Sequence, residues 1–84
     1  MDIERVPNLG PISAGWLRQA GITTLAELEA VGAVAAYLAV RQAEHAVSLN
    51  LLWALAAGLA GCRWDSLSGE EKRQLREQLA AAER

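Results

Sequence analysis

Apolar side chains recur at helical spacing in five stretches of the chain, with turn and capping residues between them. The first stretch predicts a helix over residues 11–20. Pro11 suits its first turn, where a missing N–H leaves no hydrogen bond unmade. Gly21 is typical of the left-handed residue that ends a helix, and Ile22 supplies the apolar side chain that often follows it. The apolar face of this helix is expected to consist of Ile12, Trp16 and Leu17.

A second, shorter helix is predicted between Thr24 and Gly32. Thr24 and Glu27 have the spacing of a capping box, in which each side chain accepts a hydrogen bond from the other residue's backbone N–H. Gly32 ends the helix. Its buried face is expected to consist of Leu25, Leu28 and Val31.

Two further helices are predicted over residues 33–44 and 49–61, the latter with Ser48 as its N-cap. The helix over 49–61 is apolar nearly all round, apart from Asn50, which is typical of a helix at the centre of a bundle. On the helix before it, the residues expected on one side are Val34, Tyr37, Leu38 and Arg41. Close approach of other backbones to the central helix is expected at its small residues, Ala56, Ala57, Gly58, Ala60 and Gly61.

A charged fifth helix is predicted over residues 69–83. Ser68 and Glu71 form a second capping-box pattern at its start. A narrow apolar stripe places this helix at the periphery, and the stripe consists of Leu75, Leu79 and Ala82. Since the sequence contains no internal repeat or linker, we expect residues 1–84 to form one compact all-α domain of five helices.

The composition supports this fold class. Of 44 apolar residues, 17 are alanine and 13 are leucine, and phenylalanine is absent, a balance that favours helices over sheets. A chain of 84 residues is too short for a Rossmann or TIM-barrel enzyme. With one cysteine, no internal disulfide can form, which is consistent with a reducing cytoplasm. The first residues lack the pattern of a signal peptide, and the apolar run from Leu51 is too short to span a membrane.

Residues able to carry catalysis or bind a metal are scarce. A nucleophile needs a base within reach and a third group that orients the base. The one histidine, His45, lies in a polar connector, and Cys62 follows the apolar helix, where a small buried side chain is its ordinary role. Glu70 and Glu71 complement a helix dipole. We therefore expect no enzyme activity, no catalytic residues, no metal site and no cofactor.

The turn before the first helix is the one segment with a binding mechanism. Its sequence, Pro-Asn-Leu-Gly over residues 7–10, leads into a helix N-terminus whose backbone N–H groups can hold a phosphate oxygen. This pattern resembles the hairpin of helix-hairpin-helix domains, and the Pro-Asn-Leu-Gly turn of the C-terminal domain of the bacterial RNA polymerase alpha subunit. Two residues depart from it: Pro11 lacks an N–H, and Ile12 stands where such hairpins often carry lysine. The candidate residues for contact with nucleic acid or a partner protein are Arg5, Asn8, Gly10 and Ser13.

The charge distribution argues against strong nucleic-acid binding. The net charge is −2, and residues 1–32 carry two basic and four acidic side chains. Residues 33–61 and 62–84 are each neutral. Because phosphate binding draws most of its affinity from lysine and arginine, the sequence favours protein contacts and leaves backbone contact with nucleic acid as the alternative.

The three tryptophans divide by position. Trp16 and Trp53 have the spacing of core residues. Trp64 follows the apolar helix and has two interpretations: a lid on the end of the bundle, or an exposed platform at an interface, where tryptophan is enriched.

Taken together, the ordered motifs resemble the C-terminal domain of the TfoX/Sxy family of regulators of competence and DNA transformation. The motifs are those at residues 6–11, 21–28, 31–38, 47–55 and 64–67. The resemblance implies a SAM-like or helix-hairpin-helix-like bundle that is not an enzyme. It also implies a role in bacterial competence or transcription, exerted through an unidentified protein partner. Longer members carry a separate N-terminal domain, which these 84 residues do not include, and the sequence leaves open whether a second chain supplies it. The oligomeric state stays open.

Overall fold

The computed structural model describes residues 1–43 and 47–84, so His45 and the predicted end of the third helix at residue 44 lie outside the described residues. Within that part of the chain the fold is all-α, as the sequence predicts, and contains five α-helices and two 3-10 turns. In chain order the elements are η1 (Ile3–Arg5), α1 (Pro11–Gln19), α2 (Leu25–Val31), α3 (Ala33–Gln42), α4 (Leu49–Ala60), η2 (Trp64–Ser66) and α5 (Gly69–Ala82).

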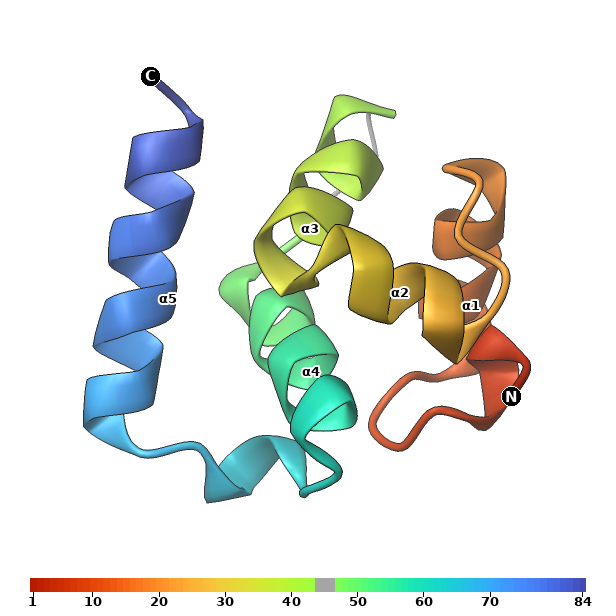
Figure 1. Ribbon diagram of the computed structural model, residues 1–84, viewed down its shortest axis with the longest axis horizontal. Coiled ribbons are helices and arrows are strands. Elements are labelled where there is room, and N and C mark those ends of the chain that lie inside the picture. Colours follow the sequence, from red (N-terminus) through yellow and green to blue (C-terminus); the bar gives the residue numbers. More distant parts are fainter. Residues whose placement is uncertain (44–46) are drawn as a thin grey trace.

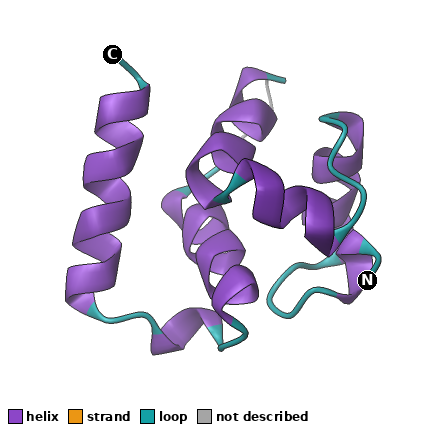
Figure 2. Cartoon of the chain, in the orientation of Figure 1, coloured by secondary structure: helices purple, strands orange, loops and turns teal. Residues whose placement is uncertain are grey.

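Helices α3 and α4 form the middle of the molecule, with α1 and α2 on one side and α5 on the other (Figure 1). The connection between α2 and α3 is short, whereas the one between α4 and α5 contains η2 (Figure 2). The molecule measures 29 × 28 × 22 Å. The predicted central helix is confirmed, because half of the residues of α4 are buried and Leu52 and Leu55 have no exposed surface. Helix α5 contacts mainly α3, and Leu79 is its one buried residue, which confirms its peripheral place. No helix in the described part of the chain is long and apolar enough to cross a membrane.

The N-terminal segment belongs to the core, which the sequence pattern did not predict. Ile3, Val6 and Leu9 are all buried. Two backbone hydrogen bonds hold the segment against the start of α2: the Ile3 N–H donates to the Thr23 carbonyl, and the Leu25 N–H donates to the Met1 carbonyl. The segment therefore contributes three apolar side chains to the bundle.

Gly58 allows the N-terminal turn to approach α4 closely. A Cβ atom at this position would lie 2.8 Å from Cγ1 of Val6 and 3.0 Å from the carbonyl oxygen of Pro7. The first distance is shorter than real Cβ contacts, and the second is tighter than nearly all of them. The close approach expected at the small residues of this helix is thus confirmed at Gly58.

The helix ends follow the local sequence signals, with two exceptions. Gly21 has a φ of +87°, and the Ile22 N–H donates to the Leu17 carbonyl at 2.9 Å, so α1 ends as predicted. The Ser68 and Glu71 capping box is also present. The Thr24 and Glu27 box is only half formed, because the Glu27 carboxylate accepts from Thr23. Ser48 is the N-cap of α4, but its side chain makes no capping hydrogen bond.

Several predicted helix faces need correction. Ile12 is 71% exposed, because the buried line of α1 runs through Ala14 and Leu17, and Ile12 lies about 140° round the helix from Leu17. Val31 is 43% exposed at the end of α2, where the chain turns at Gly32. Ala82 is exposed because it lies in the last turn of the peripheral helix. For α3 the sequence predicted only which residues share a side, and of these Tyr37 is buried, Val34 and Leu38 are half-buried and Arg41 is exposed. The other buried residues of α3 are Ala33, Ala36 and Val40.

Candidate functional site

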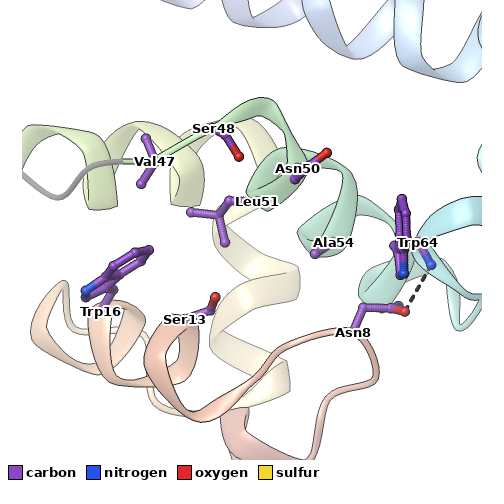
Figure 3. Close-up of a pocket in the computed structure, with 9 residues that line it drawn as sticks. All are labelled: Asn8, Ser13, Trp16, Val47, Ser48, Asn50, Leu51, Ala54 and Trp64. Atoms are coloured by element: carbon purple, nitrogen blue, oxygen red, sulfur yellow. Dashed lines mark hydrogen bonds between the residues drawn. The ribbon is translucent and has the colours of Figure 1, made fainter.

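The best-formed hollow in the described part of the chain is a cleft between α1 and the N-terminal half of α4 (Figure 3). Its volume is about 370 Å³. Residues from the N-terminal turn, α1, the start of α4 and η2 form its walls. They are Asn8, Ser13, Trp16, Val47, Ser48, Asn50, Leu51, Ala54 and Trp64.

The cleft has an apolar floor and an indole at each end. Leu51, which is only 7% exposed, lies between the two tryptophans in the close-up view (Figure 3). Trp16 comes from α1 and is half-buried against the core, whereas Trp64 comes from η2 and is 49% exposed. A bound apolar group would therefore contact aliphatic side chains beneath it and aromatic rings on two sides.

Neutral polar groups form the rest of the walls. Ser13 lies in the first turn of α1, and Ser48 and Asn50 lie at the start of α4. Neither helix has a side-chain cap or an acidic residue in its first turn, in contrast to α2 and α5. None of the lining residues carries an ionisable side chain. The cleft is thus an uncharged site with hydrogen-bonding groups at its edges.

Asn8 joins the N-terminal turn to the loop after α4. Its backbone is left-handed, with a φ of +74°. The side-chain Nδ2 donates to the Cys62 carbonyl at 2.7 Å, and Oδ1 accepts from the Trp64 N–H at 2.9 Å. Both ends of the amide therefore make hydrogen bonds within the protein.

An ion-pair cluster fixes the charges near the N-terminal turn. The Arg18 guanidinium lies 3.0 Å from the Asp2 carboxylate and 2.6 Å from the Glu4 carboxylate. The Glu4 N–H and then Arg18 hold the pKa of Asp2 below its ordinary value, and Arg18 does the same for the pKa of Glu4. Arg18 is consequently occupied by two carboxylates beside the turn that the sequence suggested for phosphate contact.

Comparison with known proteins places this fold in a family. The sequence matches the model of the TfoX C-terminal domain over residues 1–79. The chain belongs to the TfoX C-terminal domain family.

Two solved structures resemble this TfoX C-terminal domain over nearly its whole length. One is an uncharacterised protein from Listeria monocytogenes in a triclinic crystal form. It is 30% identical, with a TM-score of 0.88 over 99% of this chain and 94% of that chain. The other is a protein of unknown function from the same organism in a tetragonal form. It is also 30% identical, with a TM-score of 0.86 over 96% of this chain and 99% of that chain. No curated protein matches the sequence.

The structure brings together three of the five candidate residues of this TfoX C-terminal domain. Asn8, Ser13 and Trp64 all line the cleft. Arg5 is exposed on η1, and Gly10 is the N-cap of α1; neither is among the lining residues. The half-exposed Trp64 does not form a closed lid, and its indole is a wall of the cleft.

Sequence reasoning missed the α4 side of the cleft. It assigned Trp16 to the core and placed α4 at the centre of the bundle, because this helix is apolar nearly all round, apart from Asn50. The available signal was Asn50, the one polar side chain in an otherwise apolar helix. Asn50 is exposed and marks the turn of α4 that reaches the surface beside Ser48.

The ionisable residues do not assemble into a metal centre. In residues 1–43 and 47–84, no group of three or more histidine, cysteine, aspartate or glutamate side chains is placed to hold a metal ion. Cys62 is half-buried at the end of α4. His45 falls in the short segment that the structure does not describe.

A second, wider hollow of about 630 Å³ lies between α3, α4 and α5. Its walls are almost wholly aliphatic, with Gln78 as the polar exception. It has no aromatic side chain and few groups that could orient a ligand. The cleft between α1 and α4 is for this reason the stronger candidate for specific binding.

Proposed function

We propose that this TfoX C-terminal domain is a non-enzymatic, cytoplasmic protein-binding module in competence or transcription-related regulation. Its binding site is the cleft between α1 and α4, which receives an apolar side chain of the partner. Family membership supports the regulatory setting, and the construction of the cleft supports protein binding.

One observation carries the proposal: an apolar floor between two indoles, edged by neutral polar groups. Leu51 and the tryptophans Trp16 and Trp64 supply the apolar contacts. Protein interfaces typically combine an apolar centre with a polar rim, and tryptophan is enriched among the residues that carry their binding energy. The cleft has this arrangement on the scale of a single partner side chain.

Exposed apolar side chains near the cleft extend this surface. Ile12 is the sequence neighbour of Ser13 at the start of α1, and Leu49 lies between Ser48 and Asn50 at the start of α4. Together with Trp64, they are three of the five exposed large apolar side chains in the described residues. Exposed large apolar side chains next in sequence to residues that line a cleft are consistent with an interaction surface.

The uncharged lining defines the chemistry of the partner. A charged side chain in the cleft would lose its hydration without meeting an opposite charge, which is costly. An aliphatic or aromatic side chain can bury its surface on Leu51. Backbone groups beside it can pair with Ser13, Ser48 and Asn50. We infer that the partner presents one apolar side chain on a segment with free backbone polar groups.

The test is affinity capture from a bacterial lysate with a matched pair of variants. Ala54→Arg places a long charged side chain in the cleft, and Ala80→Arg places the same side chain on the exposed surface of α5. We expect wild type and Ala80→Arg to capture the same protein, and Ala54→Arg to capture at least tenfold less of it. Equal capture by both variants, or no reproducible partner, contradicts the proposal.

Contact with the nucleic-acid backbone is the second candidate, and one observation favours it. Helix α1 begins without a side-chain cap and without an acidic residue in its first turn, which suits an anion. Two observations argue against nucleic-acid binding. Pro11 lacks the N–H that could hold a phosphate oxygen, and the Asn8 side-chain amide already makes hydrogen bonds to Cys62 and Trp64.

Fluorescence anisotropy of labelled duplex DNA, measured at low and at moderate salt, tests this candidate. Binding at low salt that weakens steeply as salt rises would support it. No binding at low salt would remove it.

A further inference from the structure

We propose that Asn8 is the positioning residue of the cleft: its side-chain amide fixes Trp64 as one wall. The turn over residues 7–10 is then a latch between the N-terminal segment and the end of α4. The inference deepens the proposed function and rests on it for the consequence for binding, while the latch itself can be tested without a partner.

The two hydrogen bonds of Asn8 bracket one residue of the loop after α4. Nδ2 donates to the Cys62 carbonyl, and Oδ1 accepts from the Trp64 N–H, so Arg63 lies between the two bonded groups. The bonds connect positions 54 and 56 residues apart in the sequence. The side-chain amide thus acts as a backbone peptide group would, because it donates to the Cys62 carbonyl and accepts from the Trp64 N–H.

Asparagine is the residue that meets both requirements at this position. The left-handed backbone at Asn8 excludes most side chains, whereas glycine, asparagine and aspartate tolerate it. Glycine has no side chain to reach Cys62 or Trp64. Aspartate can accept from the Trp64 N–H, but its carboxylate cannot donate to the Cys62 carbonyl.

The approach of the turn to α4 sets the reach of the amide. Because Gly58 has no Cβ, Val6 and the Pro7 carbonyl can lie directly against the helix. Asn8 follows Pro7 and therefore comes within hydrogen-bond distance of the loop that leaves α4. Gly58 and Asn8 therefore act in the same contact between the N-terminal turn and the end of α4. Gly58 leaves room for the turn, and the Asn8 side chain makes the hydrogen bonds.

The latch matters for binding because it holds the backbone of Trp64 from the N-terminal side, in addition to the packing of η2 against α4. Element η2 has three residues, and its indole is half-exposed. If the Trp64 side chain is already fixed in the free protein, it loses less conformational entropy when a partner binds. Asn8 therefore strengthens binding by acting through Trp64.

The test uses NMR on the full chain without any partner. Asn8→Gly keeps the left-handed backbone and removes both hydrogen bonds. We expect hydrogen exchange at the Trp64 backbone N–H to accelerate about tenfold, as the loss of one such bond implies. We also expect the Trp64 indole N–H signal to shift while the Trp53 signal stays in place. In Asn8→Asp, which keeps the acceptor, we expect an intermediate exchange rate.

Thr24→Ala is the control for a merely structural effect. It removes a helix cap on α2 and lowers stability, but it leaves the contacts of Trp64 intact. All spectra are recorded at a temperature where every variant is folded. The proposal is overturned if neither Asn8 variant changes Trp64 exchange or its indole signal, or if Thr24→Ala changes them as much.

The result separates the latch from the proposed function. If Trp64 exchange changes in the Asn8 variants but no partner is captured, the positioning role of Asn8 is supported and the binding role of the cleft is contradicted. The opposite result is a partner that wild type captures and Ala54→Arg does not, with unchanged Trp64 exchange in the Asn8 variants. It would support the cleft as a binding site and contradict the positioning role of Asn8.

Discussion

At the scale of single residues, the fold depends on two places where only one residue type fits. At Gly58 a Cβ would overlap Val6 and crowd the Pro7 carbonyl. At Asn8 the backbone is left-handed and the amide makes two hydrogen bonds. Both positions hold the N-terminal turn against α4, so the turn and the helix form one packed unit.

Gly58→Ala tests this close contact. The added methyl must displace Val6 and a backbone carbonyl, so we expect the free energy of unfolding to fall by about 1–3 kcal/mol. Gly15→Ala in α1 is the matched control, because nothing lies within 4 Å of its Cβ position. There we expect a gain of about 0.4–1 kcal/mol from the lower entropy of the unfolded chain. Urea unfolding measures both, and equal effects of the two variants would argue against the packing described.

At the scale of elements, the helix ends are set by local sequence. Ser68 and Glu71 close a full capping box on α5. Ser48 occupies the same position on α4, but its hydroxyl makes no capping bond and lines the cleft. Two serines at equivalent positions therefore have different roles, one in stability and one at the candidate site.

The two serines give a direct comparison. Ser68→Ala removes a cap, and we expect it to lower the free energy of unfolding by about 0.5–2 kcal/mol. For Ser48→Ala we expect a smaller change, because no capping bond is lost. Thermal unfolding followed by circular dichroism measures both changes. A larger loss for Ser48→Ala than for Ser68→Ala would show that this assignment is wrong.

The sequence predicted those features that depend on neighbours along the chain. Helix spans, the end of α1 at Gly21 and the Ser68 cap all follow from local spacing. Ile12 was assigned to the wrong face because apolar character alone does not identify the line of α1 that meets the core. Ile3 was missed because its burial comes from contact with distant segments. The cleft was missed for the same reason, because it forms between α1 and the start of α4, which are distant in the sequence.

At the scale of the whole molecule, the surface charges are arranged in local clusters. Arg18 pairs with Asp2 and Glu4, and Arg73 pairs with Glu70 and Glu77. Arg41 of α3 pairs with Glu83 just after α5. The basic side chains that are matched with acids in the described residues are thus Arg18, Arg41, Arg63 and Arg73. The cleft between α1 and α4, in contrast, has no ionisable side chain among its lining residues.

The acidic members of these clusters predict a dependence of stability on pH. Arg73 lowers the pKa of Glu70, and hydrogen bonds from Thr23 lower the pKa of Glu27, as Arg18 does for Glu4. Because these pKa values are lower in the folded state, their stabilising effect is complete at neutral pH. It is lost as the pH falls below about 4 through the folded-state values.

We therefore expect the midpoint of thermal unfolding to be constant near neutral pH and to fall in acid. Arg18→Gln should make the fall shallower, because Glu4 then titrates closer to its ordinary pKa. Scanning calorimetry across the acid range checks this. A midpoint that rises on acidification would contradict the assigned direction.

Identifying what occupies the cleft in living bacteria tests directly whether the cleft binds a protein. A photo-crosslinking amino acid in place of Trp64 reports on the cleft, and the same group in place of the exposed Ala80 reports on α5. We expect one specific crosslinked protein from position 64, which is absent from position 80 and is lost when Ala54→Arg is added. Crosslinks to nucleic acid alone, or the same products from both positions, would contradict it.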